Sequence, residues 1–324
     1  MLRAAIYGAG HWGTRLIESV QGQSATIRFT TAVTRDPAAL APLGERFGLR
    51  LTSSYDAVLA DPDIDAIVLA TPHSQHAAQI VAAAQAGKHL FVEKPFTLIR
   101  ADAEAAIVAC RAARVTLGVG FNRRHAPAYA EMARRIAAGA IGAVRHIEGN
   151  FSGPPSYQVD PTNWRSNRIE SPGGSMTARG CHVLDAMVHI AGPVREVSAF
   201  SERLQFDFDV DDTTVCLLRF AGGATGSLAT LHAATQTWRL QAFGSKGALE
   251  MRGETELIAS DLNGPVERVT FEALDKERAQ LEAFAAAVAG GVKFVIAPED
   301  IVNVVAATEA VAEAAQSGGR VTIA

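Results

Sequence analysis

A glutamate and a lysine in this chain occupy a position suited to proton transfer. Glu93, Lys94 and Pro95 come directly after the apolar run 89–92, so the lysine is expected to project from the end of a strand. In a partly dry cleft beside another positive charge, the pKa of a lysine falls toward neutrality, and the neutral amine then accepts a proton. Glu93 could orient the lysine or bind a ligand hydroxyl. From position alone, an ordinary solvated ion pair is the alternative.

A second candidate lies further along the chain, where His182 and Asp185 are three residues apart. This spacing places both side chains on one face of a helix. A histidine relays protons near neutral pH, and a nearby carboxylate can fix its tautomer. A buried histidine bonded to the backbone is the alternative. We therefore take Lys94, His182 and Asp185 as the candidate catalytic residues.

A glycine-rich turn lies near the start of the chain, and we expect it to position a ligand for these groups. The apolar run 2–7 leads into a G-x-G-x-x-G pattern, and 14–20 is typical of a helix. The first glycine allows a tight turn, the second lets the backbone approach a pyrophosphate, and the third lets helix and strand pack closely. Between a strand and a helix this pattern predicts a dinucleotide site, with the phosphates at the helix N-terminus. The expected contacts are Gly8, Gly10, His11, Trp12 and Gly13.

The residues after the second predicted strand bear on the choice between two dinucleotides. NAD sites usually carry a carboxylate there, which binds the ribose 2′-hydroxyl. This chain has Thr34 and Arg35 instead, and an arginine can pair with a 2′-phosphate and stack on adenine. The pattern favours NADP. NAD stays possible, because Asp36 could bind the ribose if the turn shifts by one residue, and an exposed arginine without a ligand is the alternative.

The pattern of apolar runs predicts two domains of different architecture. Through residue 120, apolar runs alternate with amphipathic stretches, which is typical of a parallel sheet covered on both faces. Beyond 120, alternating runs separated by glycine turns indicate a large, mostly antiparallel sheet, with helices over 276–289 and 299–315 behind it. The fold class is therefore α/β, with an N-terminal Rossmann doubly wound sheet over 1–120 and a C-terminal α+β domain with an open sheet over 121–324.

Net charge, hydropathy and cysteine content exclude several kinds of binding partner for this chain. The net charge of −4 gives no basic field for nucleic acid. No apolar run approaches the ~20 residues that span a bilayer, and no signal peptide is evident at the start. The three cysteines are widely spaced and form no metal or redox pattern. We expect a cytoplasmic protein that acts on a small molecule, with no metal, nucleic-acid or membrane partner.

Several short motifs follow one another in a specific order through nearly the whole chain, and they begin at Gly8, Ala70, Glu93, Gly120, Gly180, Asp212 and Gly244. In these motifs the chain resembles the glucose–fructose oxidoreductase / inositol dehydrogenase (Gfo/Idh/MocA) family. The resemblance implies an NAD(P)-dependent oxidoreductase that acts on sugar-like or cyclic hydroxyls and ketones. It also implies that the second domain binds substrate and buries one face of its sheet against a partner subunit, as a homodimer or homotetramer.

The resemblance places further residues near the nicotinamide half of the cofactor. The loop at Thr71 and Pro72 is expected to contact it through the backbone, and Glu93 through the ribose. His76 is a further candidate contact, although a role at the entry of a helix, without ligand contact, is an equal alternative. The expected cofactor residues beyond the glycine turn are Thr34, Arg35, Thr71, Pro72, His76, Glu93 and Lys94.

The chain departs from the family at one position that bears on mechanism. The resemblance leads us to expect an aspartate four residues before His182, where this chain has Ala178 followed by Arg179. The set of lysine, aspartate and histidine is therefore incomplete.

Three explanations are open for this departure. Thr177, Asp185 or a residue of the Pro-rich loop 152–172 could replace the missing partner. Alternatively, Lys94 manages the proton alone. Thirdly, the reaction is not ordinary alcohol oxidation.

The second domain is expected to supply most of the substrate contacts. Asn122 and Arg123 open this domain, and Trp164 and Arg165 could cover the cleft from the Pro-rich loop. An aromatic ring and a guanidinium suit a polyol or a carboxylated sugar, and they equally suit loop packing. The expected substrate residues are Lys94, Asn122, Arg123, Trp164, Arg165 and His182.

The leading functional hypothesis is an NADP(H)-linked dehydrogenase or reductase that moves hydride between the nicotinamide and a carbinol or carbonyl carbon. A non-catalytic nucleotide-binding regulator is the first alternative, suggested by the missing carboxylate at Ala178. A same-fold enzyme that acts on an imine or another non-alcohol bond is the second.

Overall fold

Short, almost wholly apolar runs form the first sheet of the computed structural model, which describes residues 1–154 and 161–324. All six strands are parallel, in the order β3-β2-β1-β4-β5-β6 of the doubly wound dinucleotide-binding fold. The predicted parallel sheet is confirmed, with one short strand, β3, that the sequence pattern did not indicate. The strands are β1 (Leu2–Tyr7), β2 (Ile27–Val33), β3 (Arg50–Thr52), β4 (Ala66–Leu69), β5 (His89–Val92) and β6 (Leu117–Val119).

Helices join successive strands and cover the first sheet. The core beneath them is apolar, built from the inward faces of β1, β2 and α1 together with Phe91 of β5. The helices in this part of the chain are α1 (His11–Val20), α2 (Ala41–Phe47), α3 (Tyr55–Leu59), α4 (His76–Gln85) and α5 (Arg100–Ala113).

The chain separates into two compact units that do not follow one simple boundary. The first unit comprises residues 1–97, 101–122 and 275–298, and the second comprises 98–100, 123–274 and 299–324. Helix α8 (Lys276–Val288) therefore belongs to the first unit, where Leu281 and Phe284 enter the apolar core. The sequence places this helix behind the second sheet, and the structure differs because its apolar face completes the core of the first.

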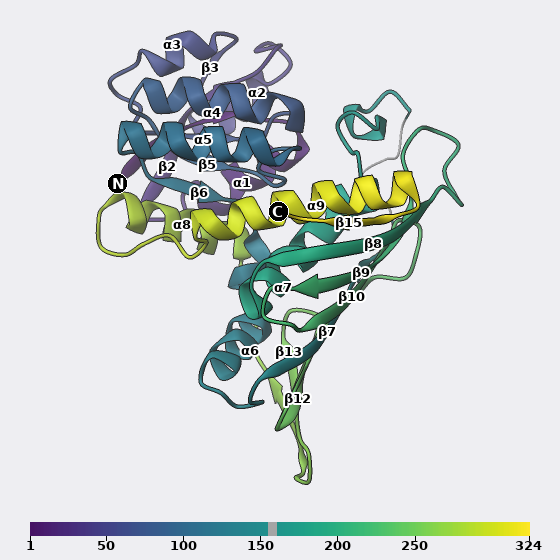
Figure 1. The fold of residues 1–324 in the computed structure, drawn as a ribbon. Coiled ribbons are helices and arrows are strands. Elements are labelled where there is room, and N and C mark those ends of the chain that lie inside the picture. Colours follow the sequence, from purple (N-terminus) through teal and green to yellow (C-terminus); the bar gives the residue numbers. More distant parts are fainter. Residues whose placement is uncertain (155–160) are drawn as a thin grey trace. The chain divides into compact units, whose positions relative to one another are not determined.

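The second unit is built on a nine-stranded sheet (Figure 1). Its order is β14-β13-β12-β11-β7-β10-β9-β8-β15. Strands β7 and β10 are parallel, whereas the other neighbouring strands among the described residues pair antiparallel, so the predicted mostly antiparallel sheet is confirmed. The strands are β7 (Val144–Ser152), β8 (Val194–Glu202), β9 (Thr213–Phe220), β10 (Thr225–Leu231), β11 (Thr237–Gly244), β12 (Gly247–Arg252), β13 (Glu256–Asp261), β14 (Val266–Thr270) and β15 (Arg320–Thr322).

The two faces of this sheet differ in burial. Along β9, buried and exposed residues alternate, as expected for a sheet with one covered face. On the open face, the exposed fractions are 77% for Phe200 and 62% for Leu217. The helices of this unit are α6 (Pro127–Ala137), α7 (Cys181–Ala191) and α9 (Pro298–Ser317). Within residues 1–154 and 161–324, no helix is long and apolar enough to cross a membrane.

Candidate functional site: a dinucleotide turn and a histidine-bearing helix

The glycine turn between β1 and α1 has the geometry that a dinucleotide requires. Gly8 has a positive φ of +99°, and a Cβ atom there would lie 2.4 Å from the carbonyl oxygen of Ala70. A Cβ on Gly13 would lie 2.2 Å from the carbonyl oxygen of Gly8, whereas one on Gly10 would meet nothing within 4 Å. The first and third glycines are therefore required by packing. The second faces open space, where the pyrophosphate of a dinucleotide would fit.

Helix α1 begins three residues earlier than the sequence predicts. Its first residue is His11, and the amide of Thr14 already donates to the carbonyl of Gly10 at 2.8 Å. The amides of His11, Trp12 and Gly13 therefore lie in the first turn of α1, where N–H groups at a helix N-terminus are suited to an anion. The residues present fit the phosphates of NAD(P).

The end of β2 carries the residues expected to select the adenosine half. Arg35 is exposed, and Thr34 is tied to the sheet by its amide, which donates to the carbonyl of Thr52 at 3.0 Å. The carboxylate of Asp36 accepts from the amides of Ala38 and Ala39 at 3.0 and 3.2 Å. Asp36 is thus engaged in capping the following turn, and Arg35 is an exposed cation two residues after the end of β2.

Glu93, a residue of the first unit, is buried, with 5% of its surface exposed. A Cβ on Gly120 would lie 2.7 Å from the Glu93 carboxyl group, so the absence of a side chain there makes room for it. One oxygen accepts from the amide of Lys94 at 3.3 Å. Burial raises the pKa of Glu93 to about 7, while Trp12 and Lys94 act in the opposite direction. Glu93, the neighbouring Lys94 and Trp12 are thereby brought together.

His76 and Thr71 form a second cluster beside the Lys94 segment. The His76 ring is fully buried, and Nδ1 lies 3.0 Å from the carbonyl oxygen of Pro95, while Nε2 lies 3.2 Å from that of Thr71. The predicted contact between His76 and a cofactor is not supported by this geometry, because the ring has no exposed surface. Thr71 packs beside Gly8, whose Cβ would lie 2.9 Å from the Thr71 nitrogen.

Asn122 takes part in a polar cluster that the sequence did not reveal. Its Nδ2 donates to Glu277 at 2.8 Å, and Arg15 donates to the same carboxylate at 2.9 Å. Gln280, one turn further along α8, is fully buried, and its amide has no hydrogen-bond partner among the described residues. Glu277 is 155 residues distant from Asn122 in the chain, Gln280 lies three residues further on, and no local pattern marks either of them.

In the second unit, His182 lies among aromatic and cationic side chains. It is buried in the first turn of α7, and its ring centroid is 6.0 Å from that of Phe151. The Arg123 guanidinium lies 4.8 Å from the Phe151 ring centroid and 5.5 Å from that of Trp238. Arg179 approaches Phe151 to 5.6 Å. The predicted substrate residues Arg123 and His182 thus share one aromatic neighbour, Phe151.

Both neighbours proposed to replace the missing aspartate already make hydrogen bonds within the second unit. Thr177 is buried, and its hydroxyl accepts from the amide of Gly173 at 3.1 Å. Asp185 is paired with Arg124 through both carboxylate oxygens. Burial raises the pKa of Asp185, while Arg124 acts in the opposite direction. Residues 176–180, which include Ala178, form a π-helical turn just before α7, a local irregularity frequent at functional sites.

Trp164 and Arg165 lie in the loop before this turn and stack on each other. The Arg165 guanidinium is 4.0 Å from the Trp164 ring centroid. The Arg165 amide donates to Asn163 at 3.0 Å, and its carbonyl accepts from Ser171 at 3.1 Å. Residues 155–160 of the predicted Pro-rich loop lie outside the described residues. The stacked pair is accounted for by loop packing, and a role over substrate stays a prediction.

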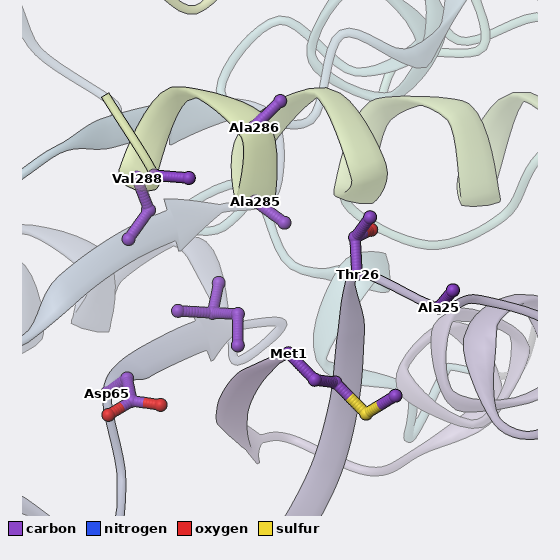
Figure 2. Close-up of a pocket in the computed structure, with 9 residues that line it drawn as sticks. Met1, Ala25, Thr26, Asp65, Ala285, Ala286 and Val288 are labelled. Atoms are coloured by element: carbon purple, nitrogen blue, oxygen red, sulfur yellow. The ribbon is translucent and has the colours of Figure 1, made fainter. Parts of the chain in front are cut away.

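A cavity of about 400 Å³ in the first unit lies at the wrong edge of the sheet for this site (Figure 2). It is lined by Leu2, Thr26 and Asp65, each at or just before the start of a strand, and by α8. The glycine turn, Arg35 and Lys94 follow the strand ends instead, where ligands of open α/β sheets bind. The cavity therefore does not belong to the candidate site.

Comparison with known proteins agrees with this geometry. Residues 2–121 match a family model described as an oxidoreductase family with an NAD-binding Rossmann fold, and residues 129–250 match the GFO/IDH/MocA C-terminal domain. The class defined is that of the two-domain, NAD-binding oxidoreductases. Within that class, the chain belongs to the Gfo/Idh/MocA family, which confirms the resemblance seen in the motifs.

Individual relatives match most of the chain. D-xylose 1-dehydrogenase (NADP⁺) 2 from Haloferax volcanii is 29% identical over 89% of this chain and 90% of its own length. Myo-inositol 2-dehydrogenase from Thermotoga maritima is 28% identical over 81% of this chain and 79% of its own. Among solved structures, the aldose-aldose oxidoreductase from Caulobacter crescentus superimposes with a TM-score of 0.88 at 28% identity, with 99% of both chains covered.

Proposed function

We propose that this protein is a dehydrogenase or reductase that acts on a CH–OH or carbonyl group of a small sugar- or polyol-like molecule, with NADP as the preferred cofactor. The observation that carries the proposal is the intact set of Gly8, Gly10 and Gly13 in the first unit, which also contains Glu93 and Lys94. Relatives named for xylose and inositol support the substrate class. The nicotinamide, when bound, supplies or accepts hydride.

The chain's own residues are assigned to proton handling and orientation. Lys94 is proposed as the group that takes the proton from the substrate hydroxyl, or returns it to the carbonyl. His182 is proposed as a second proton-handling group, and its buried position beside Phe151 keeps the ring in one place. Because both oxygens of Asp185 are paired with Arg124, we propose that Lys94 acts without the aspartate that the family pattern provides.

NADP preference rests on Arg35. It is an exposed cation two residues after the end of β2, and the neighbouring carboxylate of Asp36 accepts hydrogen bonds from its own turn. An arginine in this place suits a 2′-phosphate. A cytoplasmic location is proposed because the three cysteines are buried and form no disulfide with one another, which fits a reducing compartment.

We further propose that the open face of the second sheet is covered by another copy of the chain. Phe200, Val215 and Leu217 are exposed side by side on β8 and β9, with Phe200 paired to Val215 across the ladder. Contiguous apolar surface of this kind marks interaction sites. Light scattering of the purified chain should give a molecular mass of at least a dimer. Leu217→Arg should shift the measured mass toward that of the monomer.

The testing experiment is a substrate panel followed by nicotinamide absorbance. Aldoses, inositols, anhydro-sugars and imines are offered with NADP and with NAD, in both directions. We expect turnover with at least one sugar or polyol, faster with NADP, and none with Lys94→Met, although Lys94→Met still binds the cofactor. A fully active Lys94→Met would remove the lysine from the mechanism. Tight cofactor binding without turnover of any compound would favour the regulatory alternative.

A further inference from the structure

We propose that His76 is a positioning residue whose two ring nitrogens hold two different loops of the cofactor-binding unit. Nδ1 would fix the segment that carries Lys94, and Nε2 would fix the Thr71 loop beside the glycine turn. The proposal deepens the proposed function and rests on it for its kinetic consequences. Its structural content concerns the first unit alone.

The contacts around the ring support two separate tasks. Nδ1 lies 3.0 Å from the carbonyl oxygen of Pro95 and 3.2 Å from that of Phe96, while Nε2 lies 3.2 Å from that of Thr71. The ring has no exposed surface. All three partners are backbone carbonyls, which only accept hydrogen bonds. Each contact is therefore made when the nitrogen concerned carries a proton, and the imidazolium form makes both.

The two loops leave neighbouring strands at the same edge of the sheet. Strands β4 and β5 are parallel, with Leu69 opposite Val92 at their ends. The Thr71 loop follows the first and the Lys94 segment follows the second. A single side chain between them can therefore set the distance from the glycine turn to the lysine. That distance decides whether a bound cofactor and the Lys94 amine meet one substrate.

A second layer of bonds makes the Thr71 side of this arrangement rigid. The Thr71 hydroxyl lies 2.6 Å from Gln79 Oε1, and Gln79 Nε2 donates to Gln75 at 3.0 Å. Gln79 is one turn along α4 from His76, so both bonds to Thr71 come from the same helix. Thr71 in turn packs against Gly8, where a Cβ would lie 2.9 Å from its nitrogen. Helix α4 thus anchors the loop beneath the cofactor's pyrophosphate turn.

Two amide substitutions separate the tasks of the two nitrogens. His76→Asn places an amide nitrogen where Nδ1 lies and removes the group at Nε2, whereas His76→Gln reaches the Nε2 position and loses Nδ1. His89→Asn and His89→Gln are the matched controls. His89 begins β5 at the opposite edge of the sheet and accepts from the amide of Thr116 at 2.9 Å.

The first measurement is hydrogen exchange of the intact protein by mass spectrometry, which needs no activity. We expect His76→Gln to raise exchange about tenfold in residues 93–97 and to leave 70–75 as in wild type, since one hydrogen bond is worth about that factor. His76→Asn should raise exchange in residues 70–75 and leave residues 93–97 as in wild type. The His89 variants should change neither segment. If both His76 variants raise exchange equally in both segments, His76 is a merely structural core residue and the proposal is overturned. Exchange at the wild-type rate in both segments of both variants would also overturn it.

The second measurement separates cofactor affinity from turnover. His76→Asn should weaken NADPH binding, followed by its fluorescence, by about tenfold, with kcat at saturating cofactor close to wild type. His76→Gln should bind NADPH normally, lower kcat and shift the pH profile of kcat, because the lysine is displaced. If the wild-type protein turns over no substrate, the proposed function fails. The exchange and NADPH-binding results then still decide the role of His76.

Discussion

Arg124 and Asp185 form a bidentate ion pair in the interior of the second unit. Nε of Arg124 lies 2.7 Å from Oδ2 of Asp185, Nη2 lies 2.8 Å from Oδ1, and both side chains are 1% exposed. Asp300 at the start of α9 lies 3.3 Å from the same guanidinium. The carboxylate that the sequence associates with His182 therefore ties the segment before α6 to α7. We infer that its main contribution is to the stability of the second unit.

Removing one partner of this pair should destabilise the protein more than it impairs the reaction. For Asp185→Asn we expect a loss of about 3 kcal/mol in the free energy of unfolding, because Arg124 is left buried with only the more distant, partly exposed Asp300 as counter-charge. In the folded fraction, kcat should stay within a factor of about three of wild type. Urea denaturation and steady-state kinetics on the same preparation check this. A large fall in kcat at unchanged stability would restore the catalytic assignment.

Two controls define the source of that loss. Glu131→Gln removes a surface ion pair with Arg134 and Arg135, and about 1 kcal/mol or less should be lost. The double variant Arg124→Leu, Asp185→Leu removes both buried charges and should recover part of the stability lost in Asp185→Asn.

Gly10→Ala and Gly13→Ala form a matched pair on one turn. A Cβ on Gly10 meets no protein atom within 4 Å, so Gly10→Ala should fold with nearly wild-type stability but bind NADPH at least about tenfold more weakly, because the methyl group occupies the space of the phosphates. A Cβ on Gly13 would lie 2.2 Å from a backbone oxygen, so Gly13→Ala should lower the melting temperature as well. Calorimetry measures the melting temperature and fluorescence titration measures NADPH affinity, so the two effects are separated. Undiminished binding by Gly10→Ala would place the dinucleotide elsewhere.

Arg35→Ala should change cofactor preference without changing the fold. Loss of a charge-assisted bond to a 2′-phosphate costs about 1.5–3 kcal/mol, which raises KM for NADP about 10- to 100-fold, while KM for NAD stays nearly constant. Arg28→Ala, another exposed arginine on β2, is the control and should alter neither value. Equal or better use of NAD by the wild-type protein would remove the NADP preference.

The sequence was most informative where chemistry depends on neighbours in the chain. The roles of Gly8 and Gly13 follow from spacing, because the turn, the strand and the helix are contiguous, and the structure confirms the close approaches that exclude a side chain. The parallel sheet follows from its apolar runs for the same reason. His76 was harder, since the sequence shows a histidine near a loop but not which carbonyls surround its ring.

Long-range pairing explains what could not be predicted. Helical spacing predicts Asp185 as a partner for His182. Arg124, 61 residues earlier in the chain, instead donates hydrogen bonds to both carboxylate oxygens of Asp185. Helix α8 follows the second sheet in the chain and is therefore expected behind that sheet, but its Leu281 and Phe284 complete the core of the first unit. The sequence of an amphipathic helix shows which of its faces is apolar, but it does not show which surface of the protein that face covers.

Glu93 should make the stability of the cofactor-free protein depend on pH in a specific direction. Burial raises its pKa from 4.5 to about 7 in the folded state. The unfolded chain therefore releases the proton at lower pH than the folded protein does. The stabilising effect of the protonated carboxyl is full below about pH 4.5 and is lost as the pH rises through about 7. The upper bound for the difference is about 3 kcal/mol.

Glu93→Gln tests this because the amide is neutral at every pH and nearly isosteric. Relative to wild type, we expect the variant to gain free energy of unfolding between pH 5 and pH 8, measured by urea denaturation without cofactor. Glu45→Gln, at an exposed position of α2, is the control and should follow the wild-type curve. If Glu93→Gln and wild type stay parallel across this range, the carboxyl titrates normally. Glu93 is then an ordinary ionised residue, able to hold a ribose hydroxyl as an anion but not to store a proton beside Lys94.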